Sequence, residues 1–459
     1  MSGIQPLSPW RTELGATLQL AAPLAMTNLL QMLVHAIDVM FVARLGTDPL
    51  AASSLGITVF GLTMWGLSAL TGACAPLIAA ELGRKRHSVR EVRRTVRMAL
   101  WLAVAAGLLG MGVCSAGEWL LLQSGQDPHI AALAGDFLDV LRWAMIPMVA
   151  ASVLRIFVAA LGKPFYATLI TLAAIVTNTL GNWVFVFGHL GMPALGLEGS
   201  AISSILTALA MILAYGAVIR FDPLLRRYRV LGRWWRTEWR RMGEIVKIGT
   251  PIMLTVLAEA GLFSSAALLM GWIGKAELAA HTLALNIASL AFQVPFGISQ
   301  AATIRVGYHY GAADRAAAGR AGWAALALCM GFMVLPAGIM VLLPTLVLRI
   351  YIDPALPQNA EVVALAVQYL TVAAAFQLFD GAQAVMAGAL RGLQDTRLPM
   401  IIAILGYWAV GFSVSLWLGF STPLAGIGIW LGLAAGLVAV GALLTWRWYR
   451  REELRLLPG

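Results

Sequence analysis

The chain has 459 residues, of which 60% are hydrophobic and 12% are charged, and its net charge is +10. A soluble domain usually carries roughly 25% charged residues, so this chain has too few polar side chains to cover a soluble fold. The composition therefore indicates an integral membrane protein whose apolar residues face lipid or other helices.

Apolar segments long enough to span a membrane follow one another along the chain. A spanning helix needs about twenty mostly apolar residues, and continuous apolar runs such as residues 205–219 exclude the alternating pattern of a transmembrane β-barrel. We expect an all-α protein with twelve spans, at residues 14–45, 51–82, 95–122, 130–161, 164–188, 196–220, 244–272, 276–308, 315–349, 359–391, 396–419 and 424–449. Five prolines inside these spans predict kinks or hinges, although packing alone would also explain them: Pro23, Pro147, Pro251, Pro295 and Pro336.

The positions of the basic residues predict the orientation of the chain. The chain has 32 Lys and Arg residues. All of them except Arg44, Arg142, Lys275 and Arg349 lie at the termini, or in the loops that follow even-numbered spans and the adjoining helix ends. Basic residues mark cytoplasmic loops, so we expect a multi-pass protein of the bacterial inner membrane with both termini in the cytoplasm. The same distribution explains the net charge without a nucleic-acid partner. Residues 1–10 lack the ordered regions of a removable signal peptide.

The two halves of the chain align with each other at an offset of 228 residues. Pro23 aligns with Pro251 and Gly83 with Gly311, while residues 45–46 and 50–52 align with residues 273–274 and 278–280. An even number of spans in each half gives both halves the same orientation, so we expect two six-helix bundles related by a pseudo-twofold axis along the membrane normal. The predicted bundles are residues 1–220 and 244–459.

A cytoplasmic linker at residues 221–243 is expected to join the bundles. It contains a cluster of aromatic and basic residues that is typical of an amphipathic stretch at a membrane interface. The cluster consists of Arg233, Trp234, Trp235, Arg236 and Trp239.

Motifs of enzymes and of ATP-driven pumps are absent. The chain has no GxxxxGKS/T phosphate loop and no HExxH metal motif, so we expect no cofactor and no enzymatic activity. Cys74, Cys114 and Cys329 lie inside apolar runs without metal-ligand spacing and are predicted to be small core residues. Asp139 and Arg142 stand at i, i+3 and are predicted to form a structural ion pair.

Three carboxylates fall inside predicted spans: Asp38, Glu259 and Asp380. A charged side chain near the middle of a bilayer costs about 2.5–3.5 kcal/mol on insertion scales, so such residues usually face a cavity and serve a function. We expect these three to lie far from any fixed positive charge, in a space that water reaches. There they would exchange protons or bind a cation through their oxygens. The alternative is that each carboxyl group bonds neighbouring helices together.

Further polar residues share the spans with these carboxylates. Asn178 and Asn182 stand at i, i+4 on one helix face, and Gln31 and His35 precede Asp38 by about two turns and one turn. His35 would gate protons or simply bond a neighbouring helix. The other polar residues are expected mainly to form hydrogen bonds between helices: Ser203, Ser204, His281, Asn286, Gln293, Gln377 and Gln383.

At these residues the chain resembles the multidrug and toxic compound extrusion (MATE) family, particularly its NorM-type bacterial branch. The resemblance covers roughly residues 12–450 and rests on three segments. They are residues 23–52 around Asp38, the run Val-Pro-Phe-Gly-Ile-Ser-Gln-Ala at 294–301 with its continuation to Gly311, and the run Arg-Gly-Leu-Gln-Asp-Thr-Arg-Leu-Pro at 391–399.

The resemblance implies a V-shaped antiporter that exports organic, often cationic and amphipathic, compounds against an inward gradient of sodium ions or protons. Asp38 matches the acidic site of the first half, with Asn178 and Asn182 as its polar partners, and Ser204 stands where relatives often have Thr. Glu259 and Asp380 match the second-half cation site, where sodium would bind. Phe376 stands where some sodium-coupled relatives place a Tyr, which puts sodium coupling in doubt.

The expected function is therefore secondary antiport of small organic compounds by a monomer in the lipid bilayer, through alternating access. Asp38, Glu259 and Asp380 would couple transport to protons or sodium ions. The polar residues of the cavity would be Gln31, His35, Asn178, Asn182, Ser204 and Gln377. A lipid-linked sugar flippase of related architecture is the alternative, and it would need basic groups in the central cavity.

Overall fold

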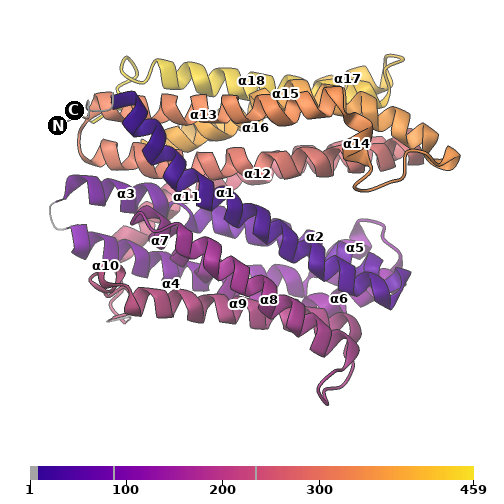
Figure 1. Ribbon diagram of the computed structural model, residues 1–459, viewed down its shortest axis with the longest axis horizontal. Helices are drawn as coiled ribbons and strands as arrows, with labels where there is room; N and C mark the ends of the chain where they lie inside the picture. Colours follow the sequence, from indigo (N-terminus) through magenta and orange to yellow (C-terminus); the bar gives the residue numbers. More distant parts are fainter. Residues whose placement is uncertain (1–8, 86–87, 233–234, 459) are drawn as a thin grey trace, which may run out of the picture. The chain divides into compact units, whose positions relative to one another are not determined.

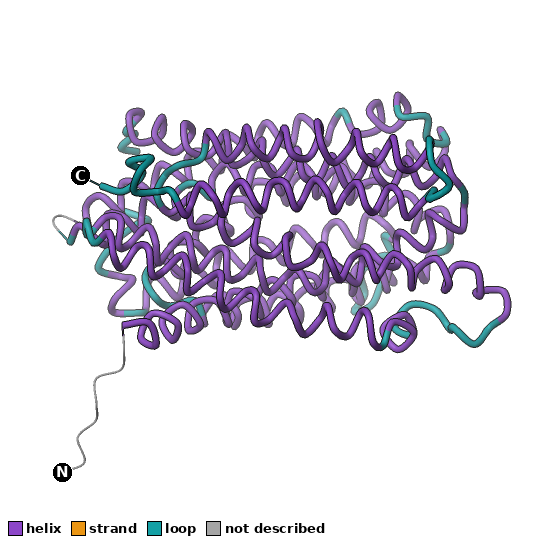
Figure 2. Tube along the Cα trace, turned by 90° about the horizontal axis from the view of Figure 1, so that it is seen from above, coloured by secondary structure: helices purple, strands orange, loops and turns teal. Residues whose placement is uncertain are grey.

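The computed structural model describes residues 9–85, 88–232 and 235–458, and every regular element in these ranges is helical (Figure 2). The helices of the first half are α1 Pro9–Val42, α2 Thr47–Thr71, α3 Cys74–Arg84, α4 Ser88–Ser115, α5 Gly117–Gln123, α6 Pro128–Leu141, α7 Met145–Ala160, α8 Phe165–Phe187 and α9 Gly196–Phe221. After α10 Pro223–Arg226, the second half has α11 Trp239–Ile273, α12 Lys275–Gly311, α13 Arg315–Leu342, α14 Pro344–Leu348, α15 Ala360–Gly392, α16 Arg397–Ile404, α17 Ser413–Phe420 and α18 Gly426–Tyr449.

Twelve helices or helix groups in the described residues are long and apolar enough to cross a membrane. This number confirms the prediction, as does the all-α class. Large apolar side chains such as Leu109, Leu213 and Trp272 are exposed along these spans, as a surface in contact with lipid requires. The three cysteines are buried and free.

Prolines explain why several predicted spans are interrupted. A proline inside a helix clashes with the carbonyl group four residues earlier. Pro76 stands four residues after Gly72, where α2 gives way to α3, and Pro147 follows the 3₁₀ turn Arg142–Ala144 between α6 and α7. Pro344 occupies the first turn of α14, just after α13 ends at Leu342.

The chain forms two compact units (Figure 1). Unit 1 contains Leu254–Gly459 together with the N-terminal segment up to Ala25, and unit 2 contains Met26–Met253. Helices α1 and α11 therefore each contribute to both units. The predicted bundles, residues 1–220 and 244–459, instead assign each of these helices to one bundle only, and they stay a prediction.

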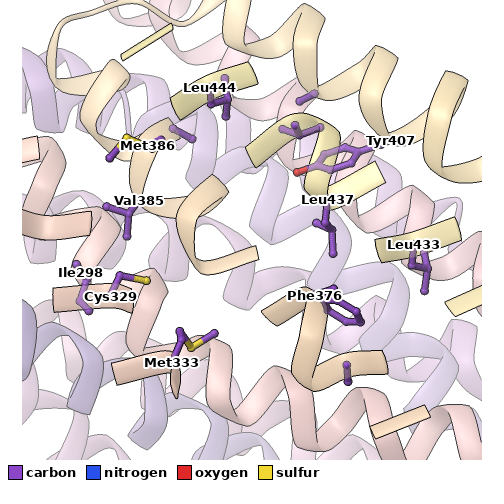
Figure 3. Packing of buried hydrophobic residues seen from close by; sticks show 14 of the residues in the cluster. Ile298, Cys329, Met333, Phe376, Val385, Met386, Tyr407, Leu433, Leu437 and Leu444 are labelled. Atoms are coloured by element: carbon purple, nitrogen blue, oxygen red, sulfur yellow. The ribbon is translucent and has the colours of Figure 1, made fainter. Parts of the chain in front are cut away.

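The core of unit 1 is built around α15. This helix lies against α12, α13 and α18, and α18 runs beside it in Figure 1. Figure 3 shows the packed side chains between them, including Phe376, Met386, Leu433 and Leu437. Phe376 stacks on the fully buried Trp430 with a ring-centroid distance of 5.5 Å. Large rings of α15 and α18 thus fix the position of the polar residues that α15 also carries.

In unit 2 the end of the predicted linker packs on α4. Arg93 Nε donates to the Tyr228 carbonyl oxygen at 2.6 Å, and Arg97 pairs with Glu238 at 3.1 Å. Arg241, at the start of α11, contacts the carboxylates of Glu81, Glu91 and Glu244 at 3.1, 2.9 and 2.8 Å. Arg233 and Trp234 of the predicted interfacial cluster lie outside the described residues.

Candidate transport site

In unit 2, Asp38 of α1 lies against the two asparagines of α8. Its Oδ1 accepts hydrogen bonds from Asn178 Nδ2 at 2.9 Å and from Asn182 Nδ2 at 2.7 Å. The asparagines are almost fully buried, whereas Asp38 is partly exposed. Amide donors aimed at a carboxylate compensate part of the cost of placing a charge in a protein interior. The helical i, i+4 spacing therefore builds a cradle for one carboxylate.

Close packing of α8 against α9 completes this cradle. A side chain at Gly181 would overlap Ser203, so the glycine lets the two helices approach. Ser203 Oγ then donates to the Asn178 carbonyl oxygen at 2.9 Å. Ser203 is the neighbour of the candidate Ser204, which is only partly buried. The Oδ1 atom of Asn182 is buried and accepts no hydrogen bond from the part of the chain that the structure describes.

No Lys or Arg among the described residues of the chain forms an ion pair with Asp38. His35, an exposed residue one turn earlier on α1, interacts with it electrostatically. Gln31, two turns earlier, is exposed and accepts a hydrogen bond from Arg155 NH1 at 3.2 Å. Asp38 thus meets the sequence expectation for a carboxylate without a fixed positive partner.

In unit 1, the second acidic pair combines α11 with one face of α15. Asp380 is buried, and no described residue forms a hydrogen bond with its Oδ1. Glu259 of α11 is partly exposed and close enough to Asp380 for the two carboxylates to interact electrostatically. Two adjacent carboxylates repel each other when both are charged, so sharing a proton or a cation stabilises the pair.

A basic residue joins this pair, contrary to the sequence expectation. Arg391, in the last turn of α15, acts electrostatically on Glu259. The expectation that every carboxylate lies far from a fixed positive charge is therefore wrong for Glu259. It missed Arg391 because the residue stands at a helix end, whereas its side chain is partly buried within unit 1. Asp380 and Arg391 lie on the same face of α15, about three turns apart.

Several oxygen atoms around the pair have no partner within the described part of the chain. They include Gln377 Oε1 and Gln383 Oε1, whereas the Tyr407 hydroxyl is a hydrogen-bonding partner of Glu259. Gln377 Nε2 donates to the Ala288 carbonyl oxygen at 2.9 Å, which fixes its position between α12 and α15. Buried polar atoms normally have partners, so these two oxygens are exceptions among the described residues.

Tyr407 reaches the pair from an irregular segment that sequence reasoning missed. Residues Leu405–Phe412 form a π-helical stretch between α16 and α17, and such stretches often occur at functional sites. The neighbouring Trp408 Nε1 donates to the Ala258 carbonyl oxygen at 3.2 Å, next to Glu259. The aromatic run in the π segment is a weak signal, because hydrophobic periodicity does not separate it from an ordinary helix.

Sodium ions prefer several oxygen ligands, as other hard cations do. The carboxylates and free oxygens of unit 1 are of this kind, whereas Phe376, one turn before Asp380, offers none and packs on Trp430 instead. No group of three or more His, Cys, Asp and Glu side chains that could hold a metal ion occurs among the described residues.

The predicted ion pair of Asp139 and Arg142 is confirmed, at 2.9 Å.

Comparison with known proteins decides the family. The sequence model of the family described as MatE matches residues 23–184 and 251–417. The chain belongs to the MatE family. The two matched ranges of this MATE chain begin at Pro23 and Pro251, which are equivalent positions of the internal repeat. The family consists of transporters and not of enzymes.

Curated relatives of this MATE transporter match it over nearly its whole length. The chain is 46% identical to the probable multidrug resistance protein NorM of Mesorhizobium japonicum over 450 residues, which cover 98% of this chain and 96% of that protein. It is 44% identical to the probable multidrug resistance protein NorM of Brucella suis over 447 residues, covering 97% and 95% of the two chains. These relatives place the chain in the NorM-type branch.

Solved structures of MATE transporters share the fold. The eukaryotic MATE transporter AtDTX14 superimposes with a TM-score of 0.85 at 19% identity, covering 98% of this chain and 100% of that chain. A mutant of the Vibrio cholerae MATE transporter VcmN gives a TM-score of 0.86 at 17% identity, with 98% of each chain covered. At this identity the likeness establishes the helical fold.

Proposed function

We propose that the chain is a secondary active antiporter of the bacterial inner membrane. It exports drugs or toxic organic compounds, often cationic and amphipathic, in exchange for protons or sodium ions. The observation that carries the proposal is the partly exposed Asp38, which two asparagines hold without an ion-pairing Lys or Arg among the described residues. Such a carboxylate has room to bind either a proton or the cationic group of a substrate. Because both compete for the same oxygens, loading one favours release of the other.

The carboxylates of unit 1 offer a second coupling site. Glu259 and Asp380 would take up a proton or a sodium ion together, with Arg391 limiting the negative charge of the pair. Each net positive charge that an exchange cycle moves inward across about 100 mV releases about 2.3 kcal/mol. That supports roughly fortyfold accumulation of substrate, since about 1.4 kcal/mol corresponds to a factor of ten.

Alternating access would use the two predicted six-helix bundles as moving parts of a monomer with cytoplasmic termini. Helices α1 and α11 pass from one compact unit to the other after Ala25 and after Met253. Each transition lies two residues beyond a proline of the internal repeat, Pro23 or Pro251. Prolines free the helix to bend, so these two positions are the proposed hinges. Binding of the coupling ion would shift the balance between inward-open and outward-open states.

Dye uptake into everted membrane vesicles tests the proposal. We expect Asp38→Asn, Glu259→Gln and Asp380→Asn each to reduce gradient-driven uptake of a cationic dye such as ethidium. Asp48→Asn removes an exposed carboxylate of α2 and should leave uptake near the wild-type rate. Replacing sodium by choline in the same assay separates the two ions, because only sodium-driven uptake is lost. If all three variants transport as the wild type does, the assignment of the coupling residues is wrong.

A further inference from the structure

The first helix of each repeat begins in the unit that the other repeat forms. Residues 9–25 of α1 belong to unit 1, with the second half of the chain, and residues 239–253 of α11 belong to unit 2, with the first half. We call these two ranges the entry segments. The repeat offset of 228 residues places the end of one segment, position 25, on the end of the other, position 253. The two repeats therefore exchange equivalent parts.

Each entry segment packs closely on a helix of the opposite repeat. In unit 1, a Cβ added at Gly297 of α12 would lie 2.6 Å from the backbone nitrogen of Ala25. In unit 2, a Cβ added at Gly249 of α11 would overlap the carbonyl oxygen of Leu70 on α2. In both contacts the glycine lets two backbones approach at a distance that a side chain would prevent.

An ion-pair cluster fixes the beginning of the α1 entry segment to α12. Arg305 donates from Nε and NH2 to the two carboxylate oxygens of Glu13, at 2.8 and 2.6 Å. His309, one turn further along α12, places its Nε2 3.3 Å from Glu13 Oε2. Glu13 is buried, and a two-pronged contact of this kind is among the stronger hydrogen-bonding arrangements in proteins. We call this cluster the α1 clasp.

A second cluster fixes the beginning of the α11 entry segment in unit 2. The NH2 group of Arg241 lies 3.1 Å from Glu81 of α3 and 2.9 Å from Glu91 of α4. We call this cluster the α11 clasp. In the α1 clasp the entry segment supplies the carboxylate, whereas in the α11 clasp it supplies the guanidinium.

The two clasps occupy equivalent places in the repeat with their charges reversed. The offset of 228 residues places Glu13 on Arg241, and it places Glu81 on His309. Docking of the α1 segment on its own repeat would therefore bring Glu13 against Glu81. Docking of the α11 segment on its own repeat would bring Arg241 against His309 and Arg305. Like charges at such largely buried positions repel each other more strongly than they do in water.

We propose that this charge reversal directs each entry segment to the opposite repeat and excludes docking on its own repeat. The clasps attract in the exchanged arrangement, and the same residues repel in the alternative one. Proteins that must distinguish similar partners commonly combine an attractive and a repulsive element in this way. The inference concerns how two similar halves assemble, and it does not depend on the proposed export function.

A photo-reactive benzophenone side chain at position 16 tests this inference in the full-length protein. Ala16 lies about one turn after Glu13 on α1 and is partly buried. In the wild-type background, illumination should link position 16 to the end of α12, as mass spectrometry of the linked peptides would show. In the charge-swapped variant Glu13→Arg/Arg241→Glu, the ratio of adducts with α3 or α4 to adducts with α12 should rise at least about tenfold, because attraction and repulsion change places.

Variants of the α1 clasp alone leave the α11 clasp intact, so they test the inference independently of how the charge-swapped variant folds. Glu13→Arg should lower the yield of α12 adducts at least about tenfold, and adding Arg305→Glu should restore the yield. The matched control is Glu361→Arg/Arg240→Glu, which swaps the same charges at two exposed positions. This control should keep the wild-type adducts.

Four results would overturn the inference. In the first, the adducts of the charge-swapped variant stay on α12. In the second, a folded charge-swapped variant loses these adducts without gaining adducts with α3 or α4, so that the ion pairs anchor the segments but do not choose their partner. In the third, Arg305→Glu fails to restore the yield of Glu13→Arg. In the fourth, wild-type adducts form with α3 or α4, so that the α1 segment is not exchanged. Transport is measured separately by the dye assay, so these results leave the proposed function standing.

Discussion

Replacing Gly388 by alanine tests the close contact of α12 with α15, the helix that carries Asp380 of the carboxylate pair. A Cβ at this position would overlap the carbonyl oxygen of Ser299 and would lie 2.5 Å from its Oγ. Because one of these atoms belongs to the backbone, rotation of a side chain does not relieve the overlap and the helices must move apart. Two interhelical hydrogen bonds then lengthen: Ser299 Oγ to the Ala384 carbonyl oxygen at 2.6 Å, and Thr303 Oγ1 to the Gly388 carbonyl oxygen at 2.9 Å.

The expected loss of stability follows from these contacts. Overpacking a tight core costs about 1–3 kcal/mol, and a hydrogen bond between membrane helices contributes about 0.6 kcal/mol. The gain in helix propensity from glycine to alanine offsets about 0.5–1 kcal/mol. Gly388→Ala should therefore destabilise the protein by about 1–3 kcal/mol.

Thermal unfolding of the detergent-solubilised protein, followed by loss of helical circular dichroism, measures this change. Gly331→Ala on α13 is the matched control, because no atom lies within 4 Å of the added Cβ. There the propensity gain acts alone, so the midpoint should stay the same or rise. A Gly388→Ala protein that is as stable as the Gly331→Ala protein would refute the close packing of α12 against α15.

Three further predictions concern the ends of the spans. Burial raises the pKa of Asp222, but hydrogen bonds from two backbone amides and from Tyr166 outweigh this effect and lower the pKa from its usual 3.8. The ionised carboxylate of Asp222 therefore stabilises the folded protein above about pH 4, and this stabilisation is lost below that pH. The difference in thermal midpoint between the wild type and Asp222→Asn should shrink as the pH falls through this range, and a constant difference would contradict the assignment. Arg241→Gln leaves three carboxylates of α3, α4 and α11 without their shared cation. The substitution should therefore lower the thermal midpoint more at low salt than at high salt. Equal effects at both salt concentrations would exclude an electrostatic cause. Asp314 caps α13 by accepting a hydrogen bond from the Ala317 amide at 2.9 Å. Asp314→Ala should therefore lower the stability of the folded protein by about 1 kcal/mol in the same unfolding assay. An unchanged stability would show that the cap is dispensable.

The sequence predicted the features that depend on local spacing. Apolar run lengths were sufficient for the number of spans, because a membrane imposes a minimum helix length. Asn178 and Asn182 could be paired with each other from their i, i+4 spacing. Their contact with Asp38 was expected only through resemblance to a family, because no local pattern reports which helices become neighbours.

Contacts between helices that are distant in the chain could not be predicted from the sequence. Arg391 looked like one of many basic residues at a helix end, and only the packing of α11 near α15 reveals that it acts on Glu259. Arg155 was likewise counted among helix-end residues, although it forms a hydrogen bond with Gln31 of α1. Ser203 rather than its neighbour Ser204 bonds Asn178, a distinction that depends on the rotation of α9. The direction of a side chain on a helix decides each of these cases, and composition does not encode it.

In the proposed mechanism, an ion gradient drives this protein to concentrate its substrate. The direct measurement uses purified protein in proteoliposomes, with a voltage and an ion gradient imposed across a membrane that contains no other transporter. We expect a cationic dye to accumulate well above its equilibrium ratio with the wild type and only to equilibrate with Asp38→Asn. If the wild-type protein merely equilibrates the dye under every imposed gradient, the protein is not an ion-driven antiporter of this dye.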